Sequence, residues 1–189
     1  SLRGAIGMVT QDTSLLHRSM RENILYGRPD ATEEQMRAAA ERAKAAEFID
    51  TLTDRHGRSG YDAQVGERGV MLSGGQKQRI SIARALLVNA EILILDDALS
   101  AVDGRTEHQI LHNLRQWGQG RTVIISAHRL SALTEASEII VMQHGHIAQR
   151  GNHDVLAQQS GWYRDMYRYQ QLEAALDDAP EIREEAVDA

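Results

Sequence analysis

The segment ILILDDALSAVD, residues 92–103, constrains the fold of this chain most strongly, because an apolar run ends directly in two carboxylates. An apolar run of this length between polar residues is typical of a buried strand. In open α/β sheets, ligands bind outside the carboxyl ends of the strands, which is where Asp96 and Asp97 would lie. The segment therefore predicts a strand that brings acidic side chains to a ligand site, with a third acid, Asp103, shortly after it.

Apolar strands alternate with amphipathic helices along the rest of the chain. A short strand is expected at 5–9 and buried strands at 91–95, 121–126 and 138–143, the last of them turning back at 144–145 to form a hairpin. Helices are expected at 18–27, 32–46, from 74 onward and at 104–117. A further helix is expected along a C-terminal stripe of Trp162, Met166, Tyr169, Leu172 and Leu176, which favours packing, with a dimer contact as the alternative. This alternation predicts an α/β fold with a mostly parallel sheet.

The net charge of −6 comes from residues 173–189, which hold seven acidic residues and one Arg. An acidic stretch that lacks aromatic residues and contains Pro180 predicts a disordered tail after a domain spanning 1–172. The remaining chain is electrically neutral, which argues against nucleic acid as a partner. With no Cys, disulfides and thiolate metal sites are excluded, and no apolar run is long enough to predict a membrane segment.

The segment LSGGQKQRISIARALL, residues 72–87, predicts a helix with an unusual start. Ser73 and Gln76 have the spacing of a capping box, and Gly74 and Gly75 stand between them. Each glycine disfavours a helix by roughly 1 kcal/mol relative to Ala, so two of them suggest a backbone that something approaches closely. Free N–H groups at a helix start attract phosphate, although a flexible capped start without a ligand is the alternative.

LSGGQ is similar to the signature sequence of the ATP-binding cassette (ABC) proteins, and further motifs of that family follow the same order. They are VTQD around Gln11, VGERG at 65–69, ILILDD at 92–97, SAVD at 100–103 and SAHRLS around His128. Within the family the chain most resembles exporter half-transporters, in particular multidrug-resistance-like ATP-binding proteins of the Mdl type. The resemblance implies a three-layer P-loop-type α/β ATPase domain over 1–172, truncated at its N-terminus, with a helical signature subdomain over about 19–88.

The resemblance also implies roles for residues near the expected strand ends. Gln11 would contact a metal ion and the attacking water, and Asp96 would hold Mg²⁺ through water. Asp97 stands where the family usually has the Glu that polarises this water. His128 would contact the γ-phosphate of ATP, so Gln11, Asp97 and His128 are the expected catalytic residues.

A second set of residues would act on the nucleotide of an opposite subunit. By resemblance, Ser73, Gly74, Gly75 and Gln76 would bind its γ-phosphate. Asp103 would communicate across the dimer interface. Glu67 would lie near the coupling helices of the membrane domain.

Two departures from the family pattern change the expected activity. No phosphate-binding G-x-x-x-x-G-K-[ST] loop occurs in the 189 residues, so the chain alone is expected to bind ATP weakly or not at all. Asp97 is one methylene shorter than Glu, a difference of about 1.5 Å. Misplacing a catalytic group by about 1 Å can cost on the order of 10²-fold in rate. The substitution therefore predicts slow hydrolysis, as in one half of a heterodimer with unequal sites.

Together these features predict the ATP-hydrolysing motor portion of an ABC exporter subunit at the cytoplasmic face of a bacterial inner membrane. Its expected partners are a transmembrane domain outside this chain, a second half-transporter subunit and an unidentified transported small molecule, with ATP and Mg²⁺ as cofactors. One alternative is a truncated remnant that neither binds nor hydrolyses ATP. An importer ATPase is disfavoured, because Arg129 follows His128 where importers typically have Asp.

Overall fold

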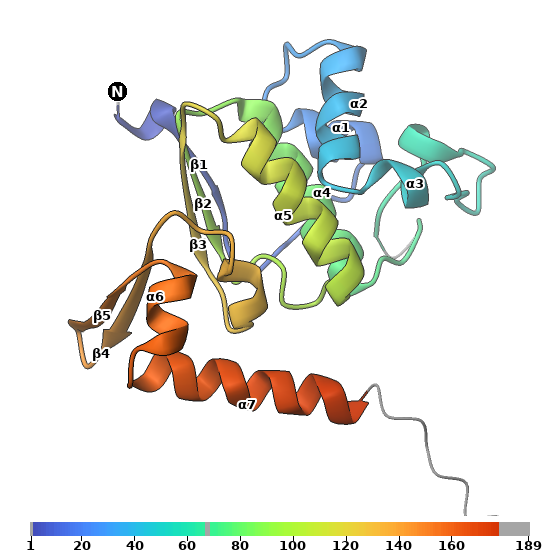
Figure 1. The fold of residues 1–189 in the computed structure, drawn as a ribbon. Helices are drawn as coiled ribbons and strands as arrows, with labels where there is room; N and C mark the ends of the chain where they lie inside the picture. The colour runs from blue at the N-terminus through green and yellow to red at the C-terminus, as the bar shows by residue number, and fades with distance from the viewer. Residues whose placement is uncertain (1, 67–68, 178–189) are drawn as a thin grey trace, which may run out of the picture. The chain divides into compact units, whose positions relative to one another are not determined.

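A computed structural model of the chain describes residues 2–66 and 69–177 (Figure 1). The chain forms two compact units, Ser1–His128 and Arg129–Ala189. Glu67 lies outside the described residues, as do residues 178–189 of the predicted acidic tail. None of the helices in the described ranges has the length and apolar character needed to cross a membrane.

The first unit contains a three-stranded parallel sheet in the order β1-β2-β3. The strands are β1 (Ile6–Val9), β2 (Ile92–Asp96) and β3 (Thr122–Ser126). Helix α5 (Gly104–Trp117) connects β2 to the parallel neighbour β3, which is the crossover that parallel strands require. The α/β fold with parallel strands predicted from the alternating pattern is confirmed.

Helices α4 (Gly74–Val88) and α5 lie on the same side of this sheet (Figure 1). Leu93 and Leu95 are fully buried and share one core with residues of both helices. Met8 in β1 and Ile124 in β3 both pair with Ile94, so they point to the other face of the sheet. There Met8 is 54% and Ile124 is 49% exposed. The strands are therefore buried on the helix side and partly open on the other.

Short helices lie between β1 and α4, in the range of about 19–88 where a helical subdomain is expected. They are α1 (Met20–Leu25), α2 (Glu33–Arg42) and α3 (Ala46–Ile49), followed by the 3-10 turn η2 (Gly60–Asp62), whereas another 3-10 turn, η1 (Leu2–Ala5), precedes β1. The single helix predicted over 32–46 is wrong, since α2 ends at Arg42. Lys44 has a φ of 55° in the left-handed region, which breaks the helix, and its carbonyl accepts a hydrogen bond from Arg79 at 2.8 Å.

The second unit contains an antiparallel pair, β4 (Ile139–Gln143) and β5 (His146–Gly151), followed by helices. The predicted hairpin is confirmed, and its turn residues His144 and Gly145 both have positive φ. The strand predicted over 138–143 is confirmed as β4, but it is buried on one face only, through Ile139 and Val141. Among the described strands β4 pairs only with β5, and its outer side chains Ile140 and Met142 are about half-exposed.

Helix α7 (Trp162–Asp177) follows η3 (Leu130–Leu133) and α6 (His153–Gln158) in the second unit. It buries Tyr163, whose hydroxyl lies 2.9 Å from His153 Nδ1. The packing predicted for the stripe of Trp162, Met166, Tyr169, Leu172 and Leu176 is largely wrong, because all of them except Met166 are at least 44% exposed. Residues 173–177, expected to begin a disordered tail, belong to α7 instead.

Candidate functional site

The carboxyl ends of β1, β2 and β3 lie at one edge of the sheet, because the strands are parallel and in register. Asp96 is the last residue of β2 and pairs with Ser126, and Asp97 follows it directly. Gln11 comes two residues after the end of β1, and His128 two residues after the end of β3. The fold thus brings the four predicted catalytic and metal-binding residues to the same edge, while their chemical roles stay predictions.

Asp97 and His128 are close enough to act on one ligand. Asp97 Oδ1 lies 3.9 Å from His128 Nε2, and the Asp97 side chain is 11% exposed whereas that of His128 is 87% exposed. Asp97 has a φ of 50°, in the left-handed region that Asp tolerates better than most residues. The turn after β2 therefore holds a sheltered carboxylate beside an imidazole that reaches into solvent.

The main chain of Asp97 is held on both sides. Its N–H donates to the carbonyl of Ser126 at 3.0 Å. Its carbonyl accepts hydrogen bonds from Ser100 Oγ at 3.0 Å and from Gln78 Nε2 at 3.5 Å. These hydrogen bonds fix the Asp97 backbone. It therefore cannot easily shift to bring the shorter Asp side chain to the position that a Glu carboxylate would reach.

The oxygen atoms at this edge suit Mg²⁺ rather than a metal bound entirely by protein. The residues described contain no group of three or more His, Cys, Asp or Glu side chains that could hold a metal ion. Mg²⁺ commonly binds through one or two carboxylates together with water and phosphate oxygens. The carboxylate of Asp96 and the amide oxygen of Gln11 are donors of this type, so the residues present fit such an ion.

The start of α4 has the capping box that the sequence predicts. Ser73 Oγ accepts a hydrogen bond from the Gln76 amide at 3.2 Å, and Gln76 Oε1 accepts one from the Ser73 amide at 2.9 Å. No acidic side chain occupies the first turn, and Ser73 and Gly74 are exposed. The positive end of this 15-residue helix is thus open to an anion, which fits a phosphate group.

Gly75 is needed for a contact within the chain. A Cβ atom at this position would lie 2.6 Å from the carbonyl oxygen of Ala101, in the loop after Asp97. A Cβ at Gly74 would meet only the Cβ of Ala101, at 3.2 Å. The close approach predicted from the two glycines is therefore made, at Gly75, by the backbone of the loop that ends at Asp103.

Asp103 is the N-cap of α5, where its Oδ1 accepts a hydrogen bond from the Thr106 amide at 2.9 Å. That amide is the main reason why the pKa of Asp103 is lowered, with a further contribution from the Thr106 side chain. The carboxylate is thus already used to begin a helix. Its predicted role at a dimer interface stays a prediction.

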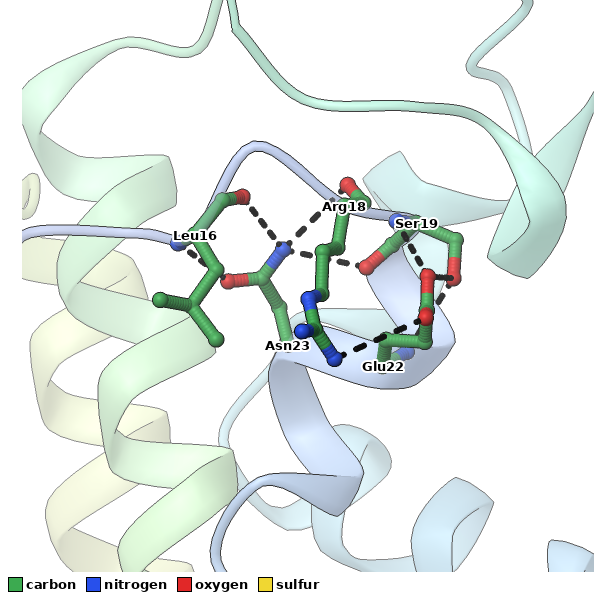
Figure 2. A network of polar contacts seen from close by, with 5 residues as sticks. All are labelled: Leu16, Arg18, Ser19, Glu22 and Asn23. Carbon is green, nitrogen blue, oxygen red and sulfur yellow. Dashed lines mark hydrogen bonds and ion pairs between the residues drawn. The ribbon is translucent and has the colours of Figure 1, made fainter.

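Asn23, which is fully buried, ties the segment after Gln11 to α1 (Figure 2). Its Oδ1 accepts from the Leu16 amide at 2.8 Å, and its Nδ2 donates to the carbonyls of Leu16 and Ser19 at 3.0 Å each. Arg84 of α4 donates from Nε to the carbonyl of Asn23 at 2.8 Å. The segment that follows Gln11 is therefore connected to α4, the helix capped by Ser73.

Asp54 organises the loop that leads from α3 toward α4. Its side chain is completely buried and accepts hydrogen bonds from the amides of His56, Arg58 and Gln64 and from the Arg58 guanidinium. Burial alone would raise the pKa of Asp54, but these hydrogen bonds outweigh it and hold the pKa well below its usual range. The sequence gives no signal for this role of Asp54, since a single Asp in a loop belongs to no pattern.

Comparison with known proteins identifies the family. The family profile described as "ABC transporter" matches residues 1–100, more than half of the chain. The chain belongs to the ABC transporter family. This ABC chain is 75% identical over all 189 residues to the multidrug resistance-like ATP-binding protein MdlA of Escherichia coli, of which it spans 31%.

Other similar ABC proteins show the same partial coverage. The ATP-dependent lipid A-core flippase of Legionella pneumophila (strain Paris) is 50% identical over 172 residues, which are 91% of this chain and 28% of the relative. The structure of a bacterial Atm1-family ABC exporter with ATP bound superposes with a TM-score of 0.83 at 44% identity, covering 90% of this chain and 29% of that one. The fold is therefore that of an ABC ATPase domain, and the chain spans about a third of its relatives' length.

Proposed function

We propose that this chain is part of the ATP-binding motor of an ABC exporter subunit, which couples ATP hydrolysis to movement of a small molecule across a membrane. The observation that carries the proposal is that Gln11, Asp96, Asp97 and His128 all lie at the carboxyl-end edge of one parallel sheet. Relatives named as a multidrug resistance-like ATP-binding protein and as a lipid flippase support the transport class.

The proposed partners lie outside these 189 residues. The chain spans 28–31% of the relatives reported above, which leaves room in such proteins for a transmembrane domain. We propose that the subunit carries its own transmembrane domain, pairs with a second half-transporter and works at the cytoplasmic face of a bacterial inner membrane.

We propose two half-sites, one serving the nucleotide of this subunit and one serving the nucleotide of the partner subunit. Asp96 and Gln11 would offer oxygen ligands to Mg²⁺, while Asp97 would orient the attacking water beside His128. Bound Mg²⁺–ATP would supply the phosphoanhydride bond that is hydrolysed. The exposed start of α4, with Ser73 as its cap, would donate hydrogen bonds to the nucleotide of the partner subunit.

The proposed subunit hydrolyses ATP slowly in its own site. Asp97 is one methylene shorter than Glu, and its backbone is held by Ser126, Ser100 and Gln78. A carboxylate withdrawn by about 1.5 Å aligns the water poorly. The capped start of α4 is intact, so it can still complete the site of the partner, and the heterodimer would have unequal sites.

This proposal is tested in a full-length heterodimer in which the catalytic Glu of the partner is replaced by Gln. We expect ATP turnover to fall on the order of 10²-fold or more, because only the site of Asp97 is left. Asp97→Glu in the same background should restore a large part of the lost turnover, while Asp97→Asn should not. Turnover close to that of the unmodified heterodimer after loss of the partner's Glu would contradict the unequal sites.

A further inference from the structure

Gln78 is a buried polar side chain that connects α4 to the turn after β2. It is 4% exposed and lies one turn beyond the cap residue Ser73. Its Oε1 accepts a hydrogen bond from the Ala101 amide at 2.9 Å, and its Nε2 donates to Ser100 Oγ at 3.0 Å. Both polar ends of the side chain are therefore bonded to the same loop.

Ser100 and Gln78 in turn contact the main chain of Asp97. Ser100 Oγ donates to the carbonyl of Asp97 at 3.0 Å, and Gln78 Nε2 lies 3.5 Å from the same oxygen. A few residues away, Gly75 leaves the space into which the carbonyl of Ala101 fits. The first two turns of α4 thus hold residues 97–101 at two points, at Gly75 through shape and at Gln78 through hydrogen bonds.

We propose that Gln78 is a positioning residue that couples the start of α4 to the main chain of Asp97. This inference rests on the proposed function, in which the start of α4 contacts the partner's nucleotide and the Asp97 carboxylate serves the subunit's own nucleotide. Through Gln78, the start of α4 and Asp97 would then move together. Glutamine suits this task because one planar amide offers an acceptor to Ala101 and a donor to Ser100 at once. A carboxylate would keep only the acceptor, and an apolar side chain would keep neither.

The first test needs no nucleotide. Amide hydrogen exchange is measured by NMR on the chain carrying Gln78→Met, which keeps the length of the side chain, with Gln116→Met on the exposed side of α5 as control. We expect the Ala101 amide to exchange on the order of tenfold faster in Gln78→Met only, while amides in the middle of α4 are unchanged. Exchange at Ala101 equal to that of the unmodified chain would overturn the proposal.

The second test adds a partner nucleotide-binding domain and a non-hydrolysable ATP analogue. In the unmodified chain we expect slower exchange at the amides of Gly74 and Ala101, whereas Gln78→Met should keep the effect at Gly74 and lose it at Ala101. An equal effect at both amides in the variant would overturn the coupling. No effect at Gly74 in the unmodified chain would instead refute the proposed function and with it the coupling, while the first test would still decide whether Gln78 fixes the loop.

Discussion

The contact between Gly75 and Ala101 makes a quantitative prediction for Gly75→Ala. The added Cβ would lie 2.6 Å from the Ala101 carbonyl oxygen, whereas ordinary contact begins near 3.4 Å, so the loop must retreat by about 0.8 Å. Forcing an extra carbon into a packed contact costs roughly 1–3 kcal/mol. The better helix propensity of Ala offsets at most about 1 kcal/mol of this cost.

Gly74→Ala is the matched control, because it gains the same propensity one residue earlier. Its added Cβ meets only the Cβ of Ala101 at 3.2 Å, which a shift of a few tenths of an ångström relieves. Helix propensity cancels when the two variants are compared. The free energy of unfolding of Gly75→Ala should therefore be about 1–3 kcal/mol lower than that of Gly74→Ala. Urea unfolding followed by circular dichroism measures both free energies. Equal stability of the two variants would refute the reasoning that Gly75 is required by the loop.

Three further predictions test the fold. Asp54→Asn should lower the unfolding temperature at neutral pH, and the difference from the unmodified chain should shrink as the pH falls below about 4. The pKa of Asp54 is lowered in the folded chain, so the carboxylate stabilises the fold above its unfolded pKa. This stabilisation is lost as the pH falls from the unfolded pKa toward the lower folded pKa. Thr32→Ala removes the cap of α2 and should reduce the free energy of unfolding by about 1 kcal/mol in urea titrations. Leu114→Ala, at a buried core position, should lose about 2–5 kcal/mol, whereas the exposed Leu172→Ala should change stability by less than about 0.5 kcal/mol.

Local patterns predicted the helix starts correctly because the partners are neighbours in the sequence. Thr32 with Gln35 and Ser73 with Gln76 each form both hydrogen bonds of a capping box. Ser19 and Glu22 form a third one, and their spacing could have been recognised in the same way. The shared edge of Gln11, Asp96, Asp97 and His128 was also predictable, since parallel strands end on the same side.

Contacts between distant residues could not be predicted in this way. The sequence shows that Gly75 admits a close neighbour, but that neighbour, Ala101, becomes visible only once α4 packs against the loop after β2. Gln78 reaches a backbone amide 23 residues away, and no short pattern indicates this. Which residues share a helix face follows from periodicity, whereas the burial of that face depends on the elements that pack against it.

Helix α7 illustrates the last point. Its apolar residues occupy more than one side, and the prediction considered the stripe through Tyr169 and Leu172 but not the side with Tyr163. The small core of the second unit, which contains Leu156 and Val141, takes Tyr163. The stripe stays mostly exposed for this reason, although its periodicity is regular.

We propose that this chain contributes the start of α4 to a nucleotide site on another subunit. Calorimetry in the presence of Mg²⁺ measures the ATP affinity of the chain alone, of a partner nucleotide-binding domain alone and of their mixture. We predict little binding to the chain alone and tighter ATP binding in the mixture than in the partner domain by itself, an increase that Ser73→Arg should abolish. Identical ATP affinity of the partner domain with and without this chain would contradict the claim.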